Sequence, residues 1–135
     1  TGTTDVLSYE DQVVAGNMLG PRIYSTGPGV FSGENIRDLD HARRVLKRYA
    51  QYYDTKTIKE YTAGNREQRQ WIIQAANELK LMPTTEGSLD VKMTITEFID
   101  GYSGHEHSIP TFPLQNDFIK LMKESRTVYT PTILV

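Results

Sequence analysis

The segments TTEG (residues 84–87) and GHEHSIP (residues 104–110) decide the fold prediction for this chain. Each ends a short run that is typical of a β-strand, within a pattern in which helices and strands alternate. Polar side chains at the carboxyl ends of successive parallel strands are where α/β enzymes keep their chemistry. Two of the three histidines lie in the second segment. The two segments therefore predict a parallel sheet and the place of a site on it.

The alternation of helix and strand extends in both directions from these segments. Runs rich in β-branched and aromatic residues predict strands at residues 22–26, 56–61, 81–85, 104–108 and 127–135. Apolar residues at three- and four-residue spacing predict helices that begin at the caps Ser8, Asp38 and Asn65, and another over residues 114–124. Residues 89–99 fit either an alternating strand or a short helix from Thr94 to Ile99.

An α/β class with parallel strands follows from this order, because right-handed βαβ units place successive strands side by side. Five strands make either an open sheet or five-eighths of a (β/α)8 TIM-type barrel, whose usual length is about 250 residues. The chain has 135 residues, no signal-peptide character at its start, and an uncapped strand at its end. These features favour a partial barrel, that is, a fragment of one catalytic domain.

Composition excludes several classes of function. The chain has 15 basic and 17 acidic residues and a net charge of −2, which gives no electrostatic case for nucleic acid or an anionic membrane. No apolar run approaches the length of a membrane span. Cysteine is absent, so disulfides, zinc–thiolate sites and cysteine nucleophiles are excluded, while the compartment stays open.

Three side chains are the main candidates for a site. If the strand faces that carry them point into a barrel, Lys59, Glu86 and His107 meet near its carboxyl-end mouth. An unpaired ammonium is costly to bury, so Lys59 needs either a carboxylate partner, for which Glu86 is the candidate, or a function. An ordinary Lys59–Glu86 ion pair without catalysis is the alternative.

The histidine pair is the next candidate. His105 and His107 share a strand face at i and i+2, a spacing that can ligate one metal ion. The alternative is that one histidine faces inward and the other is incidental, which makes His105 a secondary candidate. Glu106 is expected on the opposite face, with a structural role.

Several motifs, in order, resemble segments of the amidohydrolase superfamily, of the imidazolonepropionase and prolidase-like type found with TolB-like β-propellers. The segments are GPRIYSTG (20–27), TIK (57–59), REQRQW (66–71), TEG (85–87), DGY (100–102), GHEH (104–107) and YTPTILV (129–135). Four of them, residues 20–27, 57–59, 104–107 and 129–135, are similar to the third-strand, fourth-strand, "IEHG" sixth-strand and "PTL" seventh-strand segments of that family. The other three have close counterparts in the amidohydrolase domains found with TolB-like β-propellers. The resemblance covers the barrel from its second helix to its seventh strand.

The resemblance implies a metal-dependent hydrolase of amide or cyclic amide C–N bonds. It implies that Lys59 matches a metal-bridging carboxylated lysine and that His107 matches a metal ligand. The family's fifth-strand histidine is missing, so either Glu86 replaces it or Thr84 occupies its place. The first-strand His-x-His pair and the eighth-strand Asp lie outside this sequence. The implied cofactor is a divalent ion, zinc, manganese or iron, and the implied substrate is a small molecule or short peptide.

Two other hypotheses about the class of this protein stay open. One is a non-catalytic barrel, a binding or scaffold module beside a β-propeller, that has lost its metal; the missing fifth-strand histidine motivates it. The other is a metal-free α/β domain complete in itself. A β-propeller in the parent chain and a homo-oligomer are the macromolecular partners that we expect.

Overall fold

The computed structural model describes residues 6–29, 35–53, 55–61 and 63–132. Its centre is a four-stranded parallel sheet in the order β1-β2-β3-β4, so strands that follow one another in sequence are neighbours in space. The strands are β1 (Thr57–Glu60), β2 (Met82–Thr85), β3 (Gly104–Glu106) and β4 (Val128–Thr130). The prediction of an α/β fold with parallel strands alternating with helices is confirmed.

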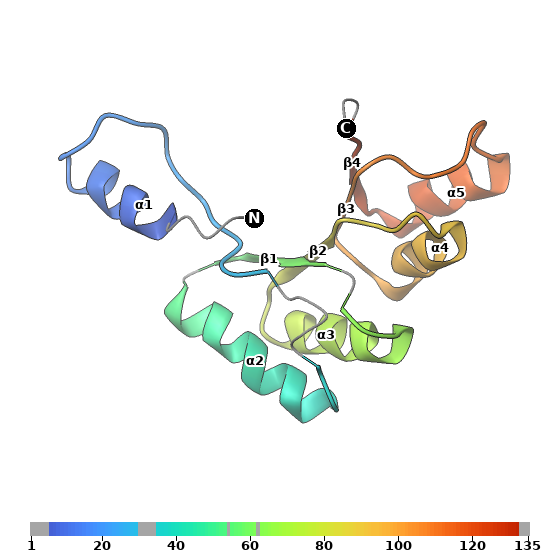
Figure 1. Cartoon of the computed structure of the whole chain (residues 1–135), viewed down its shortest axis with the longest axis horizontal. Coiled ribbons are helices and arrows are strands. Elements are labelled where there is room, and N and C mark those ends of the chain that lie inside the picture. The colour runs from blue at the N-terminus through green and yellow to red at the C-terminus, as the bar shows by residue number, and fades with distance from the viewer. Residues whose placement is uncertain (1–5, 30–34, 54, 62, 133–135) are drawn as a thin grey trace.

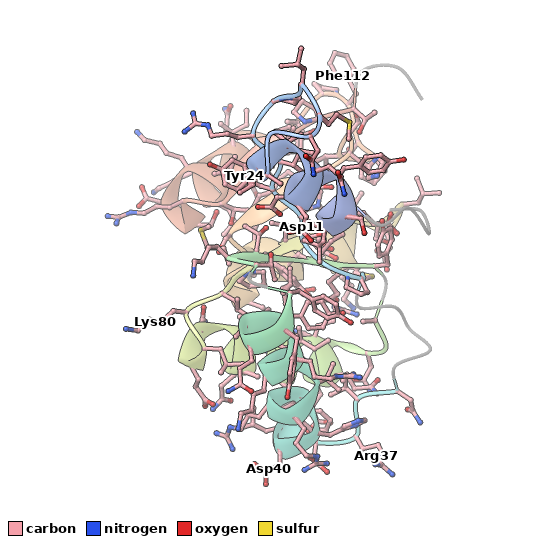
Figure 2. The ribbon with its side chains drawn as sticks, turned by 90° about the vertical axis from the view of Figure 1, so that its left-hand side faces the viewer. Asp11, Tyr24, Arg37, Asp40, Lys80 and Phe112 are labelled. Carbon is pink, nitrogen blue, oxygen red and sulfur yellow. The ribbon has the colours of Figure 1, made fainter. Side chains whose placement is uncertain are left out.

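Five helices belong to the described part of the chain. They are α1 (Val6–Val14), α2 (Leu39–Tyr52), α3 (Arg66–Glu78), α4 (Val91–Asp100) and α5 (Asn116–Ser125). Helices α2 to α5 pack in sequence order, each on the next or on the sheet, and Figure 1 shows them on one side of it. Helix α1 lies on the other side of the sheet, and Figure 2 labels Asp11 on this helix. None of these helices is long and apolar enough to cross a membrane.

The core lies between the sheet and its helices. One cluster joins α2 and α3 to β1 around Leu46, Ile58 and Ile72, and a second joins α4 and α5 around Phe98 and Phe118. Ile58 faces the first cluster, so its neighbours in β1, Lys59 and Thr57, face away from the helices. This alternation sets which polar side chains meet on each face of the sheet.

Two helices begin at the predicted caps, Asp38 and Asn65, whose side chains accept hydrogen bonds from backbone N–H groups of the first turn. The Asp38 carboxylate accepts a hydrogen bond from the His41 N–H at 2.6 Å. Asn65 and Gln68 form a reciprocal capping box at the start of α3. Residues 91–100 form a helix rather than a strand, with Asp90 as N-cap and Gly101 in the left-handed region at φ 99°.

Two predictions near the N-terminus are wrong. Residues 22–26 form no strand: Tyr24 is 83% exposed, and a hydrogen bond from the Thr55 hydroxyl to the Ser25 carbonyl (2.6 Å) joins this segment to the start of β1 without a backbone ladder. A β-branched composition does not make a strand where no neighbour offers paired backbone groups. Helix α1 begins before Ser8, which therefore lies inside the helix rather than at its cap. Of the predicted strand 127–135, residues 133–135 lie outside the described residues.

Candidate functional site

Polar side chains converge at the carboxyl ends of β1, β2 and β3, on the face of the sheet away from α2–α5. The strand register pairs Lys59 with Thr84 and Thr84 with Gly104. Glu106 lies two residues beyond Gly104, so it projects to the same face as Lys59. Register therefore brings a lysine and a glutamate together from strands that are not neighbours.

The ion pair of Lys59 is its main contact. The Lys59 ammonium donates to the carboxylate of Glu106, and the lysine side chain is only 7% exposed. The same ammonium lies 5.3 Å from the centre of the Tyr61 ring, within cation–π range. The predicted Lys59–Glu86 pair and the predicted place of Glu106 on the opposite face are both corrected here: Glu106 is the partner that the structure gives Lys59.

Glu86 faces a different residue. Its carboxylate Oε2 lies 3.9 Å from Nε2 of His107, and both side chains are partly exposed. The other ring nitrogen of His107, Nδ1, lies 3.0 Å from the hydroxyl of Thr132, which follows β4. Two of the three main candidates, Glu86 and His107, are thus adjacent, while Lys59 is held by Glu106 close by.

The position of His107 depends on the end of β3. The strand ends at Glu106, and His107 has a left-handed backbone with φ 70°. In a continued strand His107 would point to the face opposite Glu106. The turn after the strand instead places its ring beside Glu86. Strand alternation alone cannot predict this orientation.

His105 lies on the other face of the sheet. It is paired in register with Thr85 and Tyr129, it is buried, and its ring stacks on Phe98 with centroids 4.9 Å apart. Its Nε2 lies 3.2 Å from the carboxylate of Glu97. The prediction that His105 and His107 share a face is therefore wrong, because β3 does not continue through residue 107.

Tyr61 is the residue of this site that the sequence prediction left without a role. Burial raises the pKa of its phenol, and the negative charges of Glu86 and Glu106 raise it further. The phenol therefore stays protonated at neutral pH and can donate a hydrogen bond. Its place two residues after Lys59 on one strand face was a signal available in the sequence.

Two side chains of this site, Glu86 and His107, have the spacing of two ligands of one divalent ion. Carboxylate and imidazole groups bind zinc at about 2.0–2.2 Å, so two ligands of one ion lie within about 4 Å of each other, as Glu86 and His107 do. The Lys59 ammonium is not a ligand and would have to become a carbamate to join them. Within the described residues, no group of three or more His, Asp or Glu side chains is placed to hold a metal ion.

Comparison of the chain with protein-family models, curated proteins and solved structures found no match.

Proposed function

We propose that this chain contributes consecutive βα units to a (β/α)8-type barrel of a metal-dependent hydrolase that acts on amide or cyclic amide C–N bonds. The observation that carries the proposal is the convergence of Lys59, Tyr61, Glu86, Glu106 and His107 at the carboxyl ends of three successive parallel strands. In barrels of this type the active site lies at that end of the strands.

The strand order also supports a barrel. Four parallel strands in sequence order, with α2–α5 on one side, are the arrangement that successive βα units adopt in a (β/α)8 barrel. A doubly wound sheet has helices on both faces and a reversal of strand order. The described strands contain no such reversal.

In this proposal Glu86 and His107 hold one divalent ion, with Lys59 as a carbamate ligand or as the charged partner of Glu106. The ion, zinc, manganese or iron, would supply the charge that polarises a substrate carbonyl and favours ionised water. Tyr61, kept protonated by burial and by the two carboxylates, donates a hydrogen bond to an oxygen of a small-molecule or short-peptide substrate. Where Lys59 keeps its ammonium, Glu106 orients it through their ion pair.

Metal titration of the whole chain tests this proposal. We expect binding of Zn²⁺ or Mn²⁺ by calorimetry that falls at least tenfold in Glu86→Gln and in His107→Ala. The matched controls are Glu67→Gln and His41→Gln, which alter a glutamate and a histidine on α3 and α2. Equal metal affinity in the native chain and in all four variants would contradict the assignment of Glu86 and His107 as ligands. Hydrolysis of amide substrates that a chelator abolishes would extend it to catalysis.

A non-catalytic barrel-type binding or scaffold module is the second candidate function. The observation in its favour is that Glu106 already neutralises Lys59, and that the described residues hold no group of three His, Asp or Glu ligands. This module would bind without turnover. Reproducible hydrolysis that is lost on adding a chelator and restored by Zn²⁺ or Mn²⁺ excludes it.

A further inference from the structure

A buried imidazole–carboxylate pair lies behind the proposed site, on the helix-covered face of the sheet. His105 in β3 and Glu97 in α4 are both about 1% exposed, and their Nε2 and Oε2 atoms lie 3.2 Å apart. Phe98 stacks on one side of the His105 ring. Burying two such polar groups is costly unless the contacts that they make offset the lost hydration. The contacts of this pair lie at the turn that follows β2.

The imidazole of the pair packs against Gly87, the residue after Glu86. A Cβ at this position would lie 2.6 Å from Cε1 and 2.7 Å from Nε2 of His105, so the ring occupies the space that any other residue would need. Gly87 has φ 81°, in the left-handed region where glycine is favoured. The imidazole thus sets the path of the chain just after β2.

Hydrogen bonds also hold the same turn. The Gly87 N–H donates to the Thr85 hydroxyl at 3.2 Å, and that hydroxyl donates to Glu97 Oε1 at 3.4 Å. The Glu86 N–H donates to the carbonyl of Glu60 at 3.3 Å. Glu97 therefore contacts both the ring that packs on Gly87 and the hydroxyl that anchors its backbone.

The geometry points to His105, which lies beside Glu97, as a positioning residue that fixes the Glu86–Gly87 turn and so places the Glu86 carboxylate opposite His107. The test of this role by metal affinity rests on the proposed function, whereas its test by NMR without metal does not. This role replaces the secondary candidacy of His105 as a ligand, since its ring is buried among Phe98, Glu97 and Gly87.

The first measurement uses the imidazole ¹⁵N chemical shifts of His107 at one fixed pH, without metal. We expect His105→Gln and Glu97→Gln to move these signals in the direction that Glu86→Gln moves them, because each change removes or displaces the Glu86 carboxylate. Ile72→Val is the matched control, since it weakens the core between α2 and α3 without touching the turn. His107 signals that stay unchanged in both folded variants would overturn the role.

The second measurement is Mn²⁺ affinity. We expect a loss of about tenfold in His105→Gln and in Glu97→Gln, the lower end of what residues supporting a ligand usually contribute. A native chain that binds no Mn²⁺ contradicts the proposed function, while the His107 signals still decide the positioning role. Unchanged affinity in both variants, with binding in the native chain, would overturn the role.

A measurement on the native chain covers the case in which the variants do not fold. A short distance between the His105 ring proton on Cε1 and the Gly87 Hα protons follows from the packing. A strong nuclear Overhauser effect between them is the expected result. Its absence in the folded native chain would overturn the proposal without any substitution.

Discussion

The ammonium of Lys59 on β1 pairs with the carboxylate of Glu106 at the end of β3, across the intervening strand β2. The two partners differ in exposure: the lysine side chain is 7% exposed and the glutamate side chain 39%. Loss of either partner therefore leaves a different charge behind, and the two substitutions have different consequences.

Glu106→Gln is expected to destabilise the chain more than Lys59→Met. The first leaves a buried ammonium without its charge partner, whereas the second leaves a carboxylate that water can reach. We expect a loss of about 2 kcal/mol in the free energy of unfolding for Glu106→Gln, measured by urea denaturation. Arg43→Met, which removes an exposed ion pair with Glu78, is the control and should lose much less. An equal loss in Glu106→Gln and Arg43→Met would contradict this account.

The stability of the chain should fall with rising pH because of Glu60. Burial raises the pKa of this carboxyl from 4.5 to about 8, although the Tyr102 hydroxyl and Arg69 oppose the rise; Glu97 adds to it. Between these pH values the folded chain holds a proton that the unfolded chain has lost, so the stabilisation present below pH 4.5 disappears as pH rises through 8.

Glu60→Gln tests this pH dependence, since an amide carries no proton to lose. We expect the native chain to lose a few kcal/mol relative to Glu60→Gln between pH 5 and 8.5, because one pKa unit corresponds to about 1.4 kcal/mol. Urea denaturation at each pH measures it. Glu67→Gln, on the exposed start of α3, is the control, and its free energy of unfolding should fall with pH as that of the native chain does. The assignment is refuted if the free energy of unfolding of Glu60→Gln falls with pH as steeply as that of the native chain.

Acid should weaken the link between α3 and α4 through Asp100. Burial acts to raise the pKa of this carboxyl, but hydrogen bonds from Arg66 (2.6 and 2.8 Å) and Gln70 (3.0 Å) outweigh it, so the pKa is lowered below 3.8. The resulting stabilisation is present above pH 3.8 and is lost as pH falls through the lowered pKa.

Asp100→Asn should cost about 1 kcal/mol at pH 7 and much less at an acid pH below the lowered pKa, where Asp100 is itself protonated. Thermal unfolding at the two pH values measures the difference. Asp11→Asn, on the exposed surface of α1, is the control and should change little at either pH. The prediction fails if the loss in Asp100→Asn is the same at both pH values.

The capping box of α3 should contribute measurably to stability. The Asn65 side chain accepts a hydrogen bond from the Gln68 N–H at 3.0 Å, and the Gln68 side chain accepts one from the Asn65 N–H at 2.9 Å. We expect Asn65→Ala to lose about 1 kcal/mol in the free energy of unfolding. Gln115→Ala is the matched control, because Gln115 is the N-cap of α5 and makes no side-chain capping bond. Equal losses for the two changes would show that the box contributes nothing.

Much of the fold was predictable from local sequence. The caps Asp38 and Asn65 and the apolar spacing that follows them predict α2 and α3, because capping and burial of one helix face act within a few residues. The parallel strands after them follow from the alternation with helices. Residues 89–99 were ambiguous, because their apolar residues fit both the strand period and the helix period. The structure forms a helix over Val91–Asp100, in which Thr94 and Phe98 are buried.

The candidate site shows where local reasoning ends. The sequence placed Lys59, Glu86 and His107 near the carboxyl ends of three strands, because side chains alternate along a strand and parallel strands end at one edge. Only the tertiary structure decided that Glu106 is the partner of Lys59 and that His105 turns away from His107. Those outcomes depend on the register between strands and on the left-handed turn at His107, and both are set by packing between segments distant in the chain.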